Sequence, residues 1–199
     1  MMPLRDITYL AKGKRGIAST ARLGTRIVLV KERNPRASVD TIAHEARILG
    51  IVNSHGIGPR LVRHEPTRLI REYVTGVGIE EWTRRATPRA TRAMLTRLLD
   101  QCRTLDTIRI DKREMTRPYK HVLIACGIPT QIDYDRARES PRPHNVTQLC
   151  QFLTAGRYAH LLAERGVNID KERLLSAAKT YKKTYANEGY DRIRAIING

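Results

Sequence analysis

Short apolar runs separated by glycine or proline turns make up the first 75 residues of the chain. This pattern predicts five strands, at residues 7–10, 17–21, 26–31, 60–64 and 68–74. Between the third and fourth strands, the apolar residues of 41–52 recur at helical spacing after the break at Asn34-Pro35. We therefore expect residues 1–75 to form an antiparallel five-stranded sheet with one helix.

Beyond the glycine-containing linker at residues 76–78 the pattern becomes helical. Apolar spacing predicts helices at residues 79–85, 88–108, 145–164 and 171–186. Two short apolar runs, at residues 122–125 and 128–132, flank Gly127 and predict a tight β-hairpin. The sequence thus predicts an α+β protein with two domains, residues 1–75 and a mainly helical domain over residues 76–199.

The charge balance adds a class of partner to this picture. Lys and Arg total 37 against 20 Asp and Glu, which gives a formal net charge of +17. Such an excess predicts attraction to polyanions such as RNA or nucleotide phosphates. The alternative is a solvated, arginine-rich surface with no such partner. Aromatic residues make up only 5% of the chain, and no alternation of basic and aromatic residues suggests a single-strand-binding module.

Cysteine and histidine spacing argues against a zinc site. The three cysteines form no Cys-x-x-Cys pair, so a disulfide framework is also disfavoured. The six histidines lack the spacing of zinc enzymes. No run of about 18 apolar residues and no charged leader before an apolar segment occurs. We expect a cytoplasmic protein without membrane contact.

Two stretches of the first domain offer groups that suit a phosphate. Gly13 and Gly16 allow the backbone to approach phosphate oxygens closely, and Lys14 supplies positive charge, although two such glycines also make a plain hairpin turn. Lys31 ends the most apolar strand, and Glu45 lies inside the predicted helix, either solvated or reaching back to Lys31.

The predicted hairpin carries an acidic residue on each side. Glu114 precedes its first strand and Asp133 directly follows its second, so folding the hairpin would bring two carboxylates to one site. Paired carboxylates can bind a metal and activate a nucleophile. The alternative is a plain hairpin whose flanking carboxylates only solubilise it.

The succession of these features resembles a protein kinase. The resemblance covers about residues 5–140 and is carried, in chain order, by the glycine turn, Val28-Leu29-Val30-Lys31, His44-Glu45-Ala46, Gly56-Ile57-Gly58-Pro59-Arg60-Leu61, Glu72-Tyr73-Val74, Arg117-Pro118-Tyr119-Lys120-His121-Val122 and Ile132-Asp133-Tyr134. The chain looks most like the small archaeal predicted serine/threonine kinases related to RIO and lipopolysaccharide-type kinases. This resemblance implies a two-lobed, kinase-like fold with a reduced, mainly helical C-terminal lobe.

The resemblance also implies roles for individual residues in ATP- and Mg²⁺-dependent phosphoryl transfer. Lys31, paired with Glu45, would contact the phosphates of ATP, and Asp133 would bind Mg²⁺. Glu114 would accept the proton of the acceptor hydroxyl or orient it, with Asp111 as a rival. The remaining candidates are Lys120, which would stabilise the transferred phosphoryl group, and the cofactor-binding residues Gly13, Lys14, Gly16, Glu72 and Val74.

Several positions depart from the kinase pattern. Ala11 replaces the first glycine of the phosphate loop, and Lys112-Arg113-Glu114 replaces His-Arg-Asp. His121 stands where an asparagine would bind a second metal ion, and imidazole is a poor ligand for Mg²⁺. Asp133-Tyr134-Asp135 replaces Asp-Phe-Gly, and no Ala-Pro-Glu follows.

The resemblance, its departures and the positive charge leave three possible functions. The first is an ATP-dependent phosphotransferase, either an autokinase, an ATPase or an enzyme acting on a protein or small-molecule acceptor. The second is a pseudokinase scaffold, motivated by Glu114 and His121. The third is an RNA- or ribonucleoprotein-binding protein that uses the basic surface.

Overall fold

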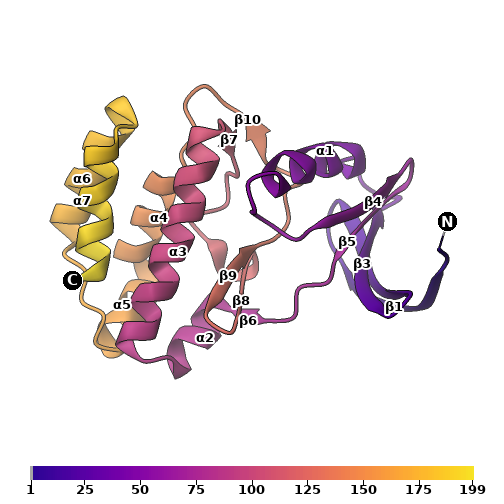
Figure 1. The fold of residues 1–199 in the computed structure, drawn as a ribbon, viewed down its shortest axis with the longest axis horizontal. Coiled ribbons are helices and arrows are strands. Elements are labelled where there is room, and N and C mark those ends of the chain that lie inside the picture. The colour runs from indigo at the N-terminus through magenta and orange to yellow at the C-terminus, as the bar shows by residue number, and fades with distance from the viewer. Residues whose placement is uncertain (1) are drawn as a thin grey trace. The chain divides into compact units, whose positions relative to one another are not determined.

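The computed structural model describes residues 2–199, and the chain divides into two compact units (Figure 1). The first unit consists of the chain up to Thr75 together with Ile132–Arg136, and the second of Gly76–Gln131 and Ala137–Gly199. The short segment Ile132–Arg136 therefore belongs with residues far from it in sequence. None of the helices within residues 2–199 has the length and apolar composition needed to cross a membrane.

The first unit is the expected antiparallel five-stranded sheet with one helix. Within the described residues its strand order is β1-β2-β3-β5-β4. The strands are β1 (Leu4–Lys12), β2 (Gly16–Leu23), β3 (Arg26–Arg33), β4 (Leu61–Glu65) and β5 (Arg68–Glu72), and the helix is α1 (Ile42–Asn53). The prediction from the alternating pattern is confirmed at this level.

Both ends of α1 are fixed by side-chain hydrogen bonds to backbone. At the start, Asp40 Oδ1 accepts from the Ile42 amide at 2.9 Å, a local bond that favours the turn into the helix. At the end, the Asn53 side chain donates to the carbonyl of Ile57 at 2.9 Å and accepts from the amide of Leu61 at 2.7 Å. These bonds lead the chain from α1 directly into β4.

The two faces of the sheet are covered differently. The helix α1 packs against β3, β4 and β5 (Figure 1). The other face carries a small apolar cluster that includes Val28, Val30 and Ile70. Because successive strand residues point to opposite faces, Lys31 points to the face opposite Val30, where α1 lies.

The second unit is mainly helical. Its helices are α2 (Ile79–Arg85), α3 (Pro88–Thr107), α4 (Asn145–Thr154), α5 (Gly156–Glu164), α6 (Lys171–Thr184) and α7 (Asn187–Asn198), with a 3₁₀ turn η1 (Pro118–Lys120). Its strands are β6 (Val77–Gly78), β8 (Val122–Ala125) and β9 (Ile128–Gln131) in one small sheet, and β7 (Ile110–Asp111) paired with β10 (Arg138–Glu139). The predicted hairpin is present as the antiparallel pair β8 and β9.

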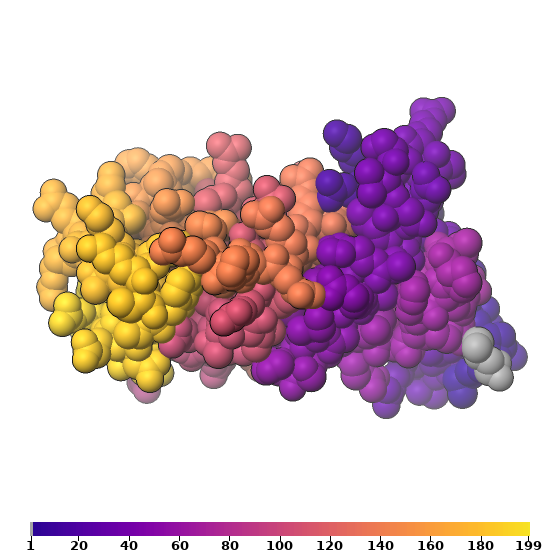
Figure 2. Space-filling view, turned by 90° about the horizontal axis from the view of Figure 1, so that it is seen from above, coloured from indigo at the N-terminus to yellow at the C-terminus, as the bar shows by residue number. Residues whose placement is uncertain are grey.

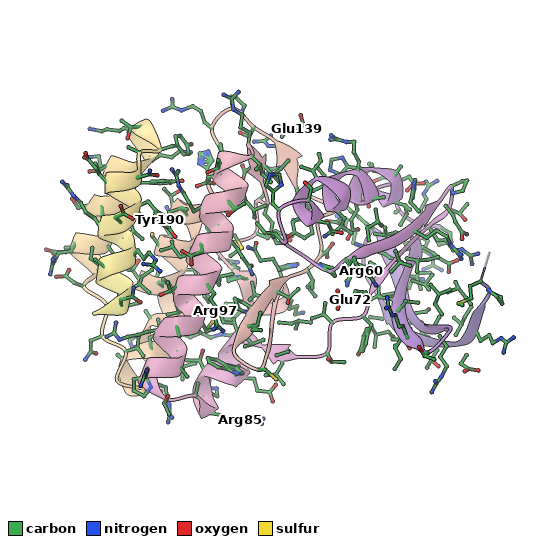
Figure 3. The ribbon with its side chains drawn as sticks, viewed as in Figure 1. Arg60, Glu72, Arg85, Arg97, Glu139 and Tyr190 are labelled. Atoms are coloured by element: carbon green, nitrogen blue, oxygen red, sulfur yellow. The ribbon has the colours of Figure 1, made fainter. Side chains whose placement is uncertain are left out.

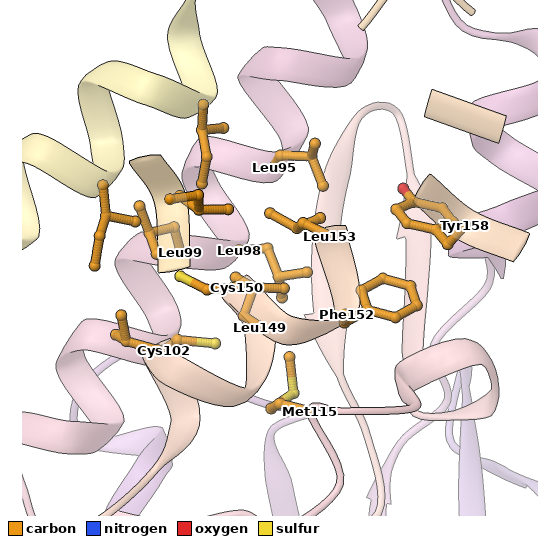
Figure 4. Close-up of a cluster of buried hydrophobic side chains, with 14 of the residues drawn as sticks. Leu95, Leu98, Leu99, Cys102, Met115, Leu149, Cys150, Phe152, Leu153 and Tyr158 are labelled. Carbon is orange, nitrogen blue, oxygen red and sulfur yellow. The ribbon is translucent and has the colours of Figure 1, made fainter. Parts of the chain in front are cut away.

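The core of this unit lies between the long helix α3 and helix α4. Leu95, Leu98 and Leu99 of α3 gather with Leu149 and Leu153 of α4, all buried (Figure 4). Burial of a leucine side chain contributes about 1.5–3 kcal/mol. This apolar contact explains why α3 shows the clearest helical repeat in the sequence.

The prediction of one helix over residues 145–164 is wrong. The chain breaks at Ala155, which has extended backbone angles, and Gly156 follows with φ 64°. Glycine enters this left-handed region without steric cost, so the break is local and α5 starts in a new direction. Apolar spacing on both sides of Gly156 concealed the break.

The final helix also differs from its prediction. It ends at Thr184, because Tyr185 adopts a left-handed conformation with φ 55°, and a further helix, α7, follows. The two helices pack against each other, and the yellow atoms of this C-terminal part lie at the surface of the second unit (Figure 2). Gly189 permits this contact, since a Cβ there would lie 2.9 Å from Tyr181 Cα.

Candidate functional site

The ammonium group of Lys31 joins two carboxylates in the first unit. Lys31 Nζ donates to Glu45 Oε2 at 2.7 Å and to Asp133 Oδ1 at 2.9 Å. Lys31 comes from β3, Glu45 from α1, and Asp133 from the segment Ile132–Arg136. The expected pairing of Lys31 with Glu45 is confirmed, and we call these three residues the Lys31 cluster.

The members of the Lys31 cluster differ in their access to solvent. The side chain of Glu45 is 1% exposed, that of Lys31 13% and that of Asp133 35%. Burial alone would lower the pKa of Lys31, but the attraction and hydrogen bonds of Glu45 and Asp133 outweigh it and raise the pKa. Lys31 is therefore a permanent cation held by one buried and one accessible carboxylate.

Residues next to Asp133 hold the buried end of this cluster. The amide of Tyr134 donates to Glu45 Oε1 at 3.4 Å. The ring of Tyr134 is buried, and Gly58 makes room for it, because a Cβ at Gly58 would lie 3.1 Å from that ring. Asp133 itself has φ 63°, a left-handed conformation that is unfavourable for residues other than glycine. Strain of this kind costs about 1–3 kcal/mol and is often found at functional sites.

The predicted glycine turn closes beside the Lys31 side chain. The Gly13 amide donates to the Gly16 carbonyl at 2.8 Å, and the Asn34 side chain donates to the Gly13 carbonyl at 2.9 Å. A Cβ at Gly16 would lie 2.9 Å from Lys31 Cε, so only glycine fits there without displacing the lysine. Lys14 is exposed at the tip of the turn.

Glu72 and Val74 are not brought together with Lys31. Glu72 pairs with Val28 across β3, so its side chain points to the face opposite Lys31. There its carboxylate accepts from the Arg60 amide at 3.2 Å (Figure 3). Val74 is half-buried in the linker that follows β5. The side chains of these two cofactor-binding candidates therefore do not belong to the Lys31 cluster.

In the second unit, Glu114 lies in a loop between β7 and η1. Its Oε2 is 3.3 Å from His121 Nδ1 and 3.9 Å from Lys112 Nζ. Lys112 is fully buried, and Arg113 adopts a left-handed conformation with φ 68°. Glu114 thus has a carboxylate held by two basic side chains, and the ring of His121 faces this carboxylate.

The other two candidates of the second unit have different surroundings. Asp111 is buried, and its Oδ1 accepts from the Arg113 amide at 3.2 Å, so its side chain fixes the loop backbone. Lys120 is exposed at the end of η1. The predicted meeting of Glu114 and Asp133 at one site stays a prediction, because these carboxylates belong to different units.

A buried hydrogen-bond network that the sequence did not suggest anchors this loop. Asp106 Oδ1 accepts from the Asn145 amide at 3.0 Å and from its side chain at 2.8 Å, and Oδ2 accepts from the Tyr181 hydroxyl at 2.9 Å. Asn145 Oδ1 in turn accepts from the Lys112 amide at 2.9 Å. Burial raises the pKa of Asp106, against the effect of these hydrogen bonds. We call Asp106, Asn145 and Tyr181 the Asp106 network.

Helix α7 is tied to α3 by polar contacts as well. The Tyr190 hydroxyl donates to Asp100 Oδ1 across these helices (Figure 3). The hydroxyls of Tyr181 and Tyr190 thus both bond aspartates of α3, Asp106 and Asp100.

Asp133 and His121 are the two candidate metal ligands of the sequence. Within residues 2–199, no three His, Cys, Asp or Glu side chains gather as a protein metal site would require. The partly exposed carboxylate of Asp133 suits Mg²⁺, which often takes one or two protein carboxylates and completes its shell with phosphates and water. The imidazole of His121 does not suit Mg²⁺, and it faces Glu114.

No family model matches the chain, and no curated protein matches it significantly.

Proposed function

We propose that this chain is an ATP-dependent phosphotransferase of the protein-kinase-like class, and that its first unit binds the phosphates. The observation that carries the proposal is the position of Lys31 Nζ between the buried Glu45 and the partly exposed Asp133. An exposed lysine without such partners would be a solvated charge. Lys31 is instead an oriented cation, and one of its two carboxylate partners, Asp133, is exposed enough to be replaced by a ligand.

The asymmetry of the Lys31 cluster suits anion binding. Glu45 is buried on α1 and keeps the ammonium in place, whereas Asp133 reaches solvent and can exchange its contact. A phosphate oxygen can take the place of Asp133 on Lys31 without moving the lysine out of its pair with Glu45. The backbone of the Gly13 to Gly16 turn lies beside the same side chain.

Asp133 would hold Mg²⁺, which would neutralise phosphate charge and so assist the departure of ADP. The chain's own residues then have separate tasks. Lys31 orients the phosphates, and Glu45 maintains the orientation of Lys31. By the resemblance to kinases, Glu114 would accept the proton of the acceptor hydroxyl or orient that hydroxyl. His121 and Lys112 would hold the Glu114 carboxylate for this task.

The proposed step transfers the γ-phosphoryl group of ATP. A bond forms between the acceptor oxygen and the γ-phosphorus, and the bond from that phosphorus to the bridging oxygen of ADP breaks. The electron pair of the broken bond stays with ADP. The proton of the acceptor hydroxyl passes to Glu114 and then to solvent.

Calorimetric titration with ATP in the presence of Mg²⁺ tests the proposal. We expect the wild-type chain to bind and Lys31→Ala to bind at least tenfold more weakly, since the phosphates lose their oriented cation. Lys179→Ala is the matched control, because Lys179 is exposed on α6 in the second unit. Equal affinities of wild type and Lys31→Ala would contradict a phosphate site at Lys31. Binding without turnover by the wild type would favour the pseudokinase scaffold.

The net charge of +17 favours a second candidate function, RNA binding. Protein that neutralises several phosphates loses affinity steeply as salt increases. We expect a fluorescent single-stranded RNA to bind without ATP and to dissociate between about 50 and 200 mM salt. Failure to bind RNA at low salt would leave the positive charge as a solvated surface.

A further inference from the structure

A second buried cation faces the Lys31 cluster from β5. Arg71 is only 5% exposed, although it lies one residue from the end of its strand. One guanidinium nitrogen, Nη1, donates to the Glu72 carbonyl at 3.0 Å. Its Nε is buried and donates to no acceptor among the described residues. A buried arginine that is only partly bonded needs an explanation beyond packing.

The strand register defines where Arg71 points. In the antiparallel pair of β3 and β5, Leu29 lies opposite Arg71 and Lys31 lies opposite Leu69. Residues directly opposite each other share a face, as do residues two apart on one strand. Arg71 and Lys31 are therefore diagonal neighbours on the face that α1 covers. Diagonal neighbours lie about 7–8 Å apart at their backbones, within reach of long side chains.

The charges on this face balance when Arg71 is included. Burial lowers the pKa of Arg71, whereas the attraction of Glu45 and Asp133 raises it. An arginine keeps its proton under these conditions. Two cations, Lys31 and Arg71, therefore compensate two carboxylates, Glu45 and Asp133. With Lys31 alone, the two carboxylates would share a single positive charge.

We propose that Arg71 is a positioning residue of the phosphate site, which shares the compensation of Glu45 when Lys31, still paired with Glu45, also contacts an anionic ligand. The inference rests on the proposed function. Lys31 cannot serve a phosphate and fully neutralise a buried carboxylate at once, and an uncompensated buried carboxylate is strongly unfavourable. Arg71 reduces this conflict, because its buried guanidinium adds a second positive charge to the same face of the sheet while the ammonium is shared with the ligand.

The sequence of β5 supports this reading. Its other arginine, Arg68, pairs with Glu65 in a partly exposed surface contact. Leu69 and Ile70 are fully buried on opposite faces. Arg71 lies on the same buried face as Leu69, where a strand residue is ordinarily apolar. Methionine has the length to fill the place of Arg71. An arginine there accepts a desolvation cost that packing alone does not require.

The test is a double-mutant cycle read by calorimetry with ATP and Mg²⁺, on the full chain. It uses Arg71→Met, Glu45→Gln and the double variant, with Arg71→Lys as the conservative variant and Arg68→Met as the matched control. We expect Arg71→Met to weaken binding at least tenfold and Arg71→Lys to recover part of the loss. In the Glu45→Gln background, Arg71→Met should change the affinity less than twofold, since the buried carboxylate is then gone and the remaining one, Asp133, is partly exposed and paired with Lys31.

Two results would overturn the inference. One is unchanged affinity in Arg71→Met, and the other is an equal loss in both backgrounds, which a purely structural arginine would produce. Failure of the wild type to bind ATP would instead contradict the proposed function. In that case, hydrogen exchange of the β3 and α1 amides still tests the pairing of Arg71 with Glu45. Faster exchange in Arg71→Met, but not when Arg71→Met is added to Glu45→Gln, would support the pairing. Faster exchange in both backgrounds, or in neither, would overturn it.

Discussion

The Lys31 cluster and the Asp106 network are both built on buried carboxylates, but they satisfy them differently. Glu45 and Asp133 are compensated by the charge of Lys31, and Asp133 stays partly exposed. Asp106 is satisfied by amide and hydroxyl donors of the second unit, among them the Asn145 amide and the Tyr181 hydroxyl. One arrangement can exchange a partner with a ligand, whereas the other is closed.

This difference shows that the partner of a buried carboxylate indicates whether the carboxylate stabilises the fold or binds a ligand. Neutral donors on a buried carboxylate hold the backbone in place, here at the start of α4 and in the loop at Lys112. A cation held between two carboxylates of unequal exposure keeps one contact that a ligand can replace. We expect loss of the first kind to reduce stability alone, and loss of the second kind to reduce both stability and ligand affinity.

The largest effect is expected from Asp106→Ala. The change leaves several buried donors without an acceptor, and each such group costs about 1–3 kcal/mol. We expect the free energy of unfolding to fall by about 4 kcal/mol. Urea unfolding followed by fluorescence measures this, because Trp82 is the chain's one tryptophan and packs against the core of the second unit.

The matched control for this prediction is Asp100→Ala, on the same helix. Asp100 is an exposed residue that bonds Tyr190 and approaches Arg194 at the surface. Exposed pairs contribute about 1 kcal/mol or less. A loss in Asp106→Ala no larger than in Asp100→Ala would contradict the scaffolding role of the network.

The second effect comes from Lys31→Met. The substitution removes the cation from the buried Glu45, and breaking a buried pair in this way costs about 3 kcal/mol. Hydrogen exchange of the β3 and α1 amides should accelerate, whereas amides of α3 in the second unit should not. Lys12→Met, on an exposed strand, should leave both sets of amides unchanged. Unaltered exchange in Lys31→Met would mean that the pair contributes nothing to the fold.

A smaller effect, confined to alkaline pH, follows from the raised pKa of Lys31. A raised pKa means that the stabilisation by Lys31 is fully present below the ordinary value of 10.5 and is lost only as pH rises through the higher value. We expect the ¹³Cε resonance of Lys31 to show no titration at pH 10.5, where an ordinary lysine is about half deprotonated. Titration at or below that pH would show that the carboxylates do not hold the ammonium.

The smallest effect concerns backbone strain in the loop that the Asp106 network holds. Arg113 has φ 68°, so Arg113→Gly should raise stability by about 0.5 kcal/mol as the relief of left-handed strain exceeds the entropy of glycine. The nearby Arg117 has φ −144°, so Arg117→Gly should lower stability instead. Thermal unfolding of both variants checks the signs, and a loss in each would argue against strain at Arg113.

The sheet, its single helix and the hairpin could be predicted because their apolar residues repeat with a clear period. The pairing of Lys31 with Glu45 could also be predicted, since a lysine near a strand end and a glutamate on the next helix can approach each other. The strand itself does not end at Lys31, because β3 continues to Arg33. The break at Gly156 was missed, because its apolar flanks continue a helical pattern across it. Helix α7 was missed for a different reason, since it depends on the close contact at Gly189.

The Asp106 network gave no sequence signal, because its members lie far apart in the chain and meet only through packing of α3, α4 and α6. Arg71 did leave a signal. It shares the strand parity of Leu69, so a buried charge could have been suspected once the register of β5 with β3 was assumed. Register, however, depends on long-range pairing that one sequence does not reveal.

The most direct test of the central claim is the Mg²⁺ dependence of ATP affinity in wild type and Asp133→Asn. The account predicts that Mg²⁺ strengthens ATP binding at least tenfold in the wild type and by less than twofold in Asp133→Asn, because the amide replaces the accessible carboxylate of the Lys31 cluster. Glu32→Gln, an exposed carboxylate next to Lys31 on β3, should behave as the wild type. An equal Mg²⁺ effect in wild type and Asp133→Asn would contradict the account.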